Sequence, residues 1–371
     1  MNKPSRAVQD DELQAIRDLA CSFASEELRK RVLDHEYPYA CQITGVIEKA
    51  REAGLFGINL PEDLGGSGLD AHALAGVLEE ISAVDAGVAA VLFTHAAALE
   101  IISIGAEDDE GSGRAIWQLV AEPDSVPLSF QCYQSPDEFD FLKAVGEERQ
   151  LVSGTLSFLV LGGLARYAVV PGARQTDRQF SYYLVDLFAD GVVKSAAILT
   201  LGMQAAQAVD VTFDQVPAVL LGAENQGGVY FNRMRSRMSR PAAAISLGIM
   251  DGSFHTALDY TRQRYQGGRN IVDWSGIRMK LADMAINIEV SRCCLSGTAS
   301  PEAASAAAIH IGGLACSATT EGVQLLGGNG YMKDYGQEKR MRDARQARSL
   351  LGMNGLKKMD YIRSILEDTA P

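Results

Sequence analysis

The chain has 371 residues, of which 47% are apolar and 22% charged. This length and composition are typical of a globular protein with a sizeable core, built as one large unit or as two to three packed subdomains. The formal net charge of −13 argues against a nucleic-acid partner, because binding to phosphates needs clustered cations. The six cysteines form no Cys-x-x-Cys pair and show no metal-ligand spacing, so we expect free thiols.

The N-terminal segment is polar and charged, and it lacks the apolar stretch of a signal peptide. No run of about 18 uninterrupted apolar residues is present, so we expect no membrane span. Free thiols and the absence of a secretion signal together favour a cytoplasmic location.

The periodicity of apolar residues changes twice along the chain. From about residue 10 to 122 the spacing is helical, with a glycine-rich turn at 65–68. Between about 126 and 222, short apolar runs predict strands at 156–161, 167–170, 182–185 and 209–213, closed by a boundary at Pro217 and Gly222. Helices are then predicted at 242–265, 275–299, 301–326 and 356–365.

This order predicts an α+β fold that is mainly helical. An N-terminal helical domain is expected over residues 1–124, a β-domain over 125–226 and a C-terminal helical bundle over 227–371.

Four segments carry a more specific pattern. They read LPEDLGGSG at 60–68, VTFDQVPAVLLGAENQGG at 211–228, SRP at 239–241 heading a long helix, and QLLGGNGY at 324–331 followed by RDAR at 342–345. In this order they resemble the acyl-CoA dehydrogenase family over nearly the whole chain. The resemblance implies the acyl-CoA dehydrogenase fold with a C-terminal four-helix bundle, FAD as cofactor, an acyl-CoA thioester as substrate, a dimer or tetramer, and an electron-transfer flavoprotein as electron acceptor.

The glycine-rich turn within the 324–331 motif suits an anion. Gly327 and Gly328 lack the Cβ atoms that would keep a phosphate away from the backbone N–H groups. The alternative from the residues alone is a helix cap that turns the chain. In the family this segment, with an Arg at the position of Arg264 and a Gln at that of Gln324, reaches the FAD pyrophosphate of a neighbouring subunit.

By the same resemblance, Phe158 and Val160 stand where an aromatic residue and a threonine lie against the flavin ring. Phe158 keeps the aromatic character, whereas Val160 lacks the hydroxyl that bonds flavin N5 in relatives. Arg240 stands at the position of the Arg on the helix that lines the acyl pocket.

The sequence departs from the family where the proton must be removed. The usual base is a Glu followed by Gly after Arg-Asp-Ala, and here this pair is Leu351 and Gly352. Leucine takes no proton, and Ser239, at the position that supplies the base in some members, is too weakly basic to serve unaided. The Gly-Ser part of the flavin-facing loop is also missing after Gln134. Asp137 in this loop is the carboxylate to test first as a replacement.

We expect the assembly containing this chain to carry out FAD-dependent α,β-oxidation of an acyl-CoA. One alternative is a non-catalytic subunit of a heteromeric acyl-CoA dehydrogenase, which completes the FAD site of a homologous catalytic partner. The other is a flavin enzyme that acts on acyl-CoA with a different base or with none.

Overall fold

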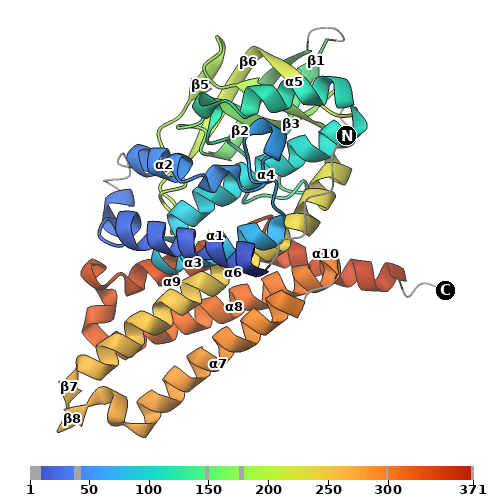
Figure 1. The fold of residues 1–371 in the computed structure, drawn as a ribbon. Helices are drawn as coiled ribbons and strands as arrows, with labels where there is room; N and C mark the ends of the chain where they lie inside the picture. The colour runs from blue at the N-terminus through green and yellow to red at the C-terminus, as the bar shows by residue number, and fades with distance from the viewer. Residues whose placement is uncertain (1–9, 37–42, 147–149, 175–178, 298–299, 369–371) are drawn as a thin grey trace.

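A computed structural model describes residues 10–36, 43–146, 150–174, 179–297 and 300–368 of the chain. In Figure 1 the strands of the six-stranded sheet lie at the top of the view, most N-terminal helices lie in the middle, and the long C-terminal helices lie at the bottom. This order of helices, strands and helices confirms the predicted mainly helical α+β fold.

The N-terminal part consists of α1 (Asp10–Phe23), α2 (Ile43–Glu52), α3 (Ala71–Val84), α4 (Ala86–Asp108) and α5 (Glu110–Val120). Helix α4 begins after Asp85, whose carboxylate accepts a hydrogen bond from Gly87 N at 2.9 Å and so caps the first turn. By length and composition α4 could cross a membrane, but 89% of its apolar window is buried inside the protein. A central core helix has the same composition, and this is the position of α4 here.

The sheet consists of β1 (Leu142–Val145), β2 (Gln150–Val160), β3 (Tyr167–Ala173), β4 (Ser181–Asp186), β5 (Val192–Lys194) and β6 (Ala208–Leu221). The strand order is β2-β1-β3-β4-β6-β5, and β2 also pairs with β6, so five strands form a closed ring. The predicted boundary at Pro217 and Gly222 agrees with the structure at Gly222, directly after the end of β6 at Leu221, but Pro217 lies within the strand. Pro217 is tolerated since it lies opposite Leu151 of β2, just before the pairing with β4 begins at Ala218.

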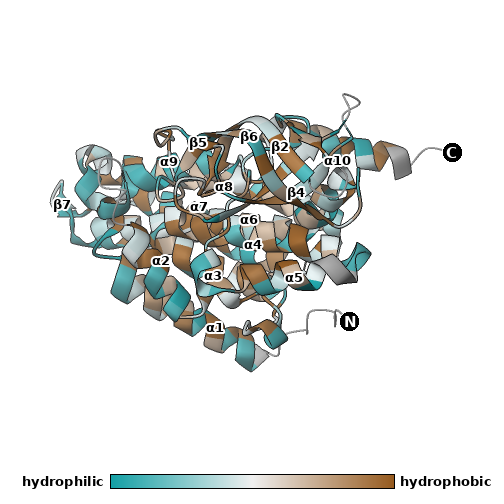
Figure 2. Cartoon of the chain, turned by 90° about the horizontal axis from the view of Figure 1, so that it is seen from above, coloured by the Kyte–Doolittle hydropathy of each residue, from teal (hydrophilic) through white to brown (hydrophobic). Residues whose placement is uncertain are grey.

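The C-terminal part consists of α6 (Gly227–Gln263), α7 (Ser275–Gly297), α8 (Pro301–Leu326), α9 (Gln337–Ala347) and α10 (Asn354–Asp368). A hairpin of β7 (Tyr265–Gln266) and β8 (Arg269–Asn270) follows α6. Figure 2 shows this hairpin as a hydrophilic tip at the opposite end of the molecule from the C-terminus.

The start of α6 differs from the prediction. The sequence predicted a helix from residue 242 with Pro241 in its first turn, whereas Pro241 lies in the interior of α6. A proline there costs one backbone hydrogen bond, roughly 3 kcal/mol in an exposed helix. The helix continues because apolar residues on both sides of the proline are buried, among them Met238, Ala243 and Ala244.

A buried ion network joins the three parts. Asp85 accepts hydrogen bonds from His35 Nδ1 at 2.8 Å and from Lys339 Nζ at 3.1 Å. Lys339 also donates to Asp343 at 2.7 Å, and Asp343 accepts from Met203 N at 2.6 Å. Burial opposes ionisation of Asp85, but the Lys339 charge and the bond from His35 hold its pKa below the ordinary range. The network therefore fixes α9 against α4 and the strand region.

Candidate functional site

The predicted site residues fall into two groups on different elements. The first group lies where the 131–138 loop, the end of β2 at 158–160 and the turn at 351–353 meet, and we name it the strand-side site. The second comprises Arg264, Gln324, Gly327 and Gly328 at the ends of α6 and α8, and we name it the bundle-tip surface.

The end of β2 is bent by a bulge at the position predicted to face the flavin. The register against β6 shifts between Leu156 and Leu159, and Phe158 has a φ of +60°. This left-handed conformation is strained for a bulky residue, and the bond from Phe158 N to Asp210 Oδ1 at 2.9 Å helps to hold it. The Phe158 ring packs edge-on against Tyr133 at 5.9 Å, whereas Val160 is completely buried.

The position of the family's catalytic Glu is part of the core. Leu351 is 2% exposed, has a φ of +64°, and donates its backbone N–H to Cys132 O at 2.7 Å. Gly352 follows with a φ of +111°, and a Cβ there would lie 2.9 Å from Ser135 Cβ. The turn is thus pressed against the 131–138 loop, with an apolar side chain in place of a base.

The carboxylate nearest this turn is Glu138, not Asp137. Glu138 Oε2 accepts hydrogen bonds from Ser135 N at 3.0 Å, Ser135 Oγ at 2.8 Å and Met353 N at 3.1 Å. Asp137 is exposed on the outside of the loop. Glu138 was visible in the sequence as one of several loop carboxylates, but only the fold places it beside Met353.

Lys357 holds the same turn from α10. Its Nζ donates to Leu350 O at 2.9 Å and to Arg348 O at 2.7 Å, and burial lowers the pKa of the Lys357 ammonium to about 8. No sequence motif pointed to this lysine, because its partners are backbone carbonyls.

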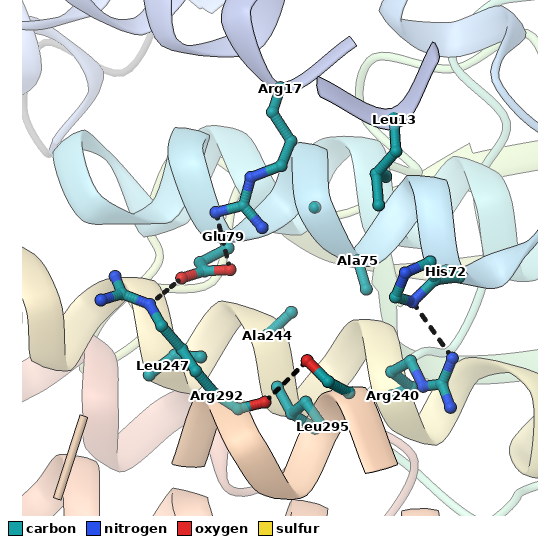
Figure 3. A pocket seen from close by; sticks show the side chains of 12 residues that line it. Leu13, Arg17, His72, Ala75, Glu79, Arg240, Ala244, Leu247, Arg292 and Leu295 are labelled. Atoms are coloured by element: carbon teal, nitrogen blue, oxygen red, sulfur yellow. Dashed lines mark hydrogen bonds and ion pairs between the residues drawn. The ribbon is translucent and has the colours of Figure 1, made fainter. Parts of the chain in front are cut away.

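Ser239 and Arg240 on α6 point to other surroundings. Ser239 is buried and donates its hydroxyl proton to Arg235 O at 2.7 Å, a bond within the helix that leaves it no activating base. Arg240 Nη1 lies 3.2 Å from His72 Nδ1 of α3, in a pocket among α1, α3, α6 and α7 (Figure 3). The residues lining this pocket include none of the strand-side site, so a contact of Arg240 with substrate remains a prediction.

The bundle-tip surface is open to solvent. Arg264, Gln324, Gly327 and Gly328 are all exposed, and a Cβ built on either glycine would meet no atom within 4 Å. The ends of α6 and α8 are adjacent, because Asn329 Nδ2 donates to the hydroxyl of Tyr260 at 3.1 Å, one turn before Arg264. The backbone N–H of Gly327 donates a hydrogen bond to Gln324 O and so caps the C-terminal end of α8. Gly327 therefore supplies room, and the Arg264 and Gln324 side chains supply donors.

The Arg-Asp-Ala motif, which is part of the family resemblance, has partners inside the protein for both of its charged side chains. Arg342 binds both oxygens of Glu36 at 3.0 and 2.9 Å and also binds Glu338. Asp343 is 1% exposed and pairs with Lys339. The motif is therefore structural in this chain.

The chain belongs to the acyl-CoA dehydrogenase family. Residues 10–109 match the family's "Acyl-CoA dehydrogenase, N-terminal domain" and residues 226–366 match its "Acyl-CoA dehydrogenase, C-terminal domain". It is therefore an oxidoreductase of the acyl-CoA dehydrogenase type by descent, and the cofactor of this flavoprotein family is FAD.

Two relatives and one solved structure illustrate the similarity. The acyl-CoA dehydrogenase of Bacillus subtilis is 28% identical over 95% of this chain and 98% of its own length. Subunit CarC of the caffeyl-CoA reductase–Etf complex of Acetobacterium woodii is 26% identical over 89% of this chain and 92% of its own. The butyryl-CoA dehydrogenase structure of Megasphaera elsdenii superposes with a TM-score of 0.86 at 22% identity, covering 99% of this chain and 100% of that one.

The two groups of residues fit FAD unequally. The bundle-tip surface suits a pyrophosphate, since two exposed donors and two glycines with open space above them lie at the adjacent ends of α6 and α8. The strand-side site does not suit the flavin ring, because Val160 and Leu351 are buried apolar side chains that offer neither hydroxyl nor base. Gln131 Oε1 is buried there without a hydrogen-bond donor, but an acceptor cannot replace the hydroxyl that donates to oxidised N5.

Proposed function

We propose that this chain is a subunit of an FAD-dependent acyl-CoA dehydrogenase in which a homologous partner supplies the catalytic base. The bundle-tip surface of this chain completes the FAD site of that partner. The observation that carries the proposal is that the two groups of residues differ in burial. The position of the base holds a buried leucine, while the residues that serve a neighbouring subunit in relatives stay exposed.

In such an assembly this chain contributes charge and hydrogen bonds at the pyrophosphate. Arg264 carries a planar guanidinium that can bind two phosphate oxygens at once, and Gln324 adds an amide donor. FAD, when bound, supplies the chemistry of accepting hydride from the β-carbon of the acyl group. The α-proton is removed by the Glu of the partner, since this chain places Leu351 there.

The substrate class and electron acceptor follow the relatives. The proposed substrate is an acyl-CoA thioester, as in the dehydrogenase of B. subtilis. The proposed acceptor is an electron-transfer flavoprotein, which is supported by the similarity to the CarC subunit of an Etf complex. The proposed location is the cytoplasm.

The second candidate function is a flavin enzyme with a different base, and Glu138 is the observation that favours it. Its carboxylate accepts a hydrogen bond at 3.1 Å from the N–H of Met353, which lies two residues after Leu351 in the chain. The same oxygen, however, already accepts two bonds from Ser135. Using it as a base would detach the loop from the turn, so we place this function second.

Co-expression tests the proposal. The chain is produced with a homologue that carries Glu-Gly after Arg-Asp-Ala, and acyl-CoA oxidation is measured with an electron-transfer flavoprotein as acceptor. We expect oxidation only in the mixed assembly, and its loss when the Glu of the homologue becomes Gln. Oxidation by this chain alone, abolished by Glu138→Gln, would instead support the second function.

A further inference from the structure

A pocket between α8 and the end of α9 holds two arginines that the proposed function does not use, and we name it the α8–α9 pocket. The two helices pack against each other, and the hollow between them has a volume of about 480 Å³. Small-molecule sites typically have roughly 300 to 1,000 Å³. The wall is largely polar, and none of the described residues that line it is acidic. They are Gly313, Cys316, Ser317 and Thr320 of α8, together with Arg345 and Arg348.

The two arginines differ from their neighbour on the same helix. Arg342, one turn before Arg345, binds both oxygens of Glu36. Within the part of the chain that the structure describes, no carboxylate pairs with Arg345 or with Arg348, and Arg348 Nε is buried without a hydrogen-bond acceptor. A buried donor that lacks an acceptor is costly. An anion from outside the chain would therefore satisfy this end of α9.

The thiol of Cys316 does not supply the missing negative charge. A Cβ built on Gly312 would lie 3.3 Å from Arg348 Cγ, so the arginine stem lies against α8 one turn before Cys316. Burial raises the pKa of the Cys316 thiol, although the charges of Arg345 and Arg348 oppose this rise. The thiol is therefore protonated near neutral pH, and it donates to Ala344 O at 3.4 Å. Both guanidinium charges remain unbalanced.

The C-terminal end of α9 does not account for the two arginines either. Basic side chains at such an end often bind the last carbonyl groups and offset the helix dipole. Here Lys357 Nζ performs this role, because it donates to Arg348 O at 2.7 Å and to Leu350 O at 2.9 Å. Burial and, after it, the charge of Arg348 lower the pKa of Lys357, so the cations repel each other. The region thus carries an excess of positive charge.

We propose that the α8–α9 pocket binds the phosphate group of a small hydroxyl-bearing ester, such as a sugar phosphate. Two guanidinium forks match the oxygens and the double charge of a phosphate monoester, whereas a monocarboxylate would balance only one of them. The hydroxyl groups of Ser317 and Thr320 each donate to a carbonyl of α8, at 3.3 and 2.8 Å. Their oxygens can therefore accept hydrogen bonds from the hydroxyl groups of the ester.

The α8–α9 pocket is distinct from both sites described above. None of its lining residues belongs to the strand-side site or to the bundle-tip surface. Thr320 nevertheless lies only one turn before Gln324 on α8, so an experiment must separate phosphate bound in the pocket from phosphate bound at the bundle tip. The inference does not rest on the proposed function.

Titration calorimetry of the full chain with ribose 5-phosphate tests the inference, with inorganic phosphate and acetate as comparison probes. We expect saturable binding of ribose 5-phosphate in about the millimolar range, and weaker binding of both comparison probes. Arg345→Gln removes one charge from an exposed position and should weaken ribose 5-phosphate binding roughly 10- to 100-fold. Arg363→Gln on α10 is the matched control, since Arg363 is also exposed and pairs with Asp360 at 3.2 Å. It should leave the binding unchanged.

A further variant fills the pocket without removing a charge. A Cβ on Gly313 meets no atom within 4 Å and leucine is the better helix former, so Gly313→Leu should stay folded by circular dichroism and weaken the binding. Arg264→Gln should leave it unchanged.

Three results would overturn the inference. The first is that ribose 5-phosphate does not bind the wild-type chain. The second is that inorganic phosphate or acetate binds as tightly as the ester. The third is that binding is lost in Arg264→Gln but kept in Arg345→Gln and Gly313→Leu, because the phosphate would then lie at the bundle tip.

Discussion

The strand-side site and the bundle-tip surface differ in how their side chains are satisfied. In the strand-side site, Leu351 is buried, its N–H is bonded to Cys132 O, and Glu138 ties the loop to the turn. At the bundle-tip surface, Arg264 and Gln324 are exposed, and the two glycines of the same surface are uncovered. The polar groups of the first region are satisfied within the chain, whereas the second region leaves its donors exposed to solvent.

The difference separates two roles that catalytic members combine in one chain. Burying a leucine at this position stabilises the fold by about 1.5 to 3 kcal/mol, and the replacement of a glutamate removes a charge that would need solvation. Exposed donors contribute little to the stability of the chain that carries them. Retaining the donors while losing the base is therefore what a subunit that serves its neighbour's cofactor would show.

The largest effect is expected from breaking the scaffold that both regions share. Asp85→Asn removes the carboxylate that His35 and Lys339 share, leaving Lys339 with Asp343 alone, and should lower the free energy of unfolding by about 3 to 5 kcal/mol in urea denaturation. Asp186→Asn removes the exposed pair with Arg166 and should change it by about 0.5 kcal/mol or less. Equal effects of the two variants would show that the buried network does not support the fold.

Restoring the family's glutamate tests whether the strand-side site is closed. Leu351→Glu should destabilise the chain by roughly 3 kcal/mol, because a packed side chain is lost and a carboxylate is buried. It should give no acyl-CoA oxidation in the chain alone. Leu351→Met, which conserves volume, should cost less than about 1.5 kcal/mol. A fully stable Leu351→Glu chain with turnover of its own would show that this side is an open active site.

Removing one donor tests the bundle-tip surface. In the assembly with the glutamate-bearing homologue, Arg264→Gln should weaken FAD binding roughly 10- to 100-fold, since a charge-assisted bond to phosphate is lost. Arg278→Gln on α7 is the control, because Arg278 is exposed and pairs with Asp273 at 2.8 Å. The release of flavin on dilution measures the FAD affinity of both variants. Equal FAD affinity in the two variants would show that Arg264 does not contact the cofactor.

The last expected effect concerns pH. His95 on α4 accepts a hydrogen bond from Leu128 N at 3.0 Å, and burial lowers the pKa of its imidazole to about 4. Between about pH 6.5 and 4 the unfolded chain then binds a proton that the folded chain does not. Stability should fall on acidification through this window, by at most about 1.4 kcal/mol per pH unit.

The variant His95→Gln checks this pH effect, because its amide oxygen keeps the acceptor and does not titrate. Urea denaturation at several pH values should show a weaker acid dependence in the variant than in the wild-type chain. Identical slopes in the two proteins would mean that His95 titrates normally in the fold.

The order of helices and strands could be predicted from the sequence, because apolar periodicity is local. The start of α6 could not, since burial on both sides of Pro241 outweighs the local preference of proline for a first turn. The departures at Leu351 and Val160 were visible by comparison with the family. The placement of Glu138 and the partners of Asp85 were not, because they join residues far apart in the chain.

The flavin content of the purified chain tests the central claim most directly. The visible absorbance spectrum and the ratio of FAD to protein are measured for the chain alone and for the chain co-expressed with its glutamate-bearing homologue. The account predicts an almost colourless protein alone and a yellow mixed assembly that an acyl-CoA bleaches. A yellow protein with stoichiometric FAD in the absence of any partner, bleached by an acyl-CoA, would contradict it.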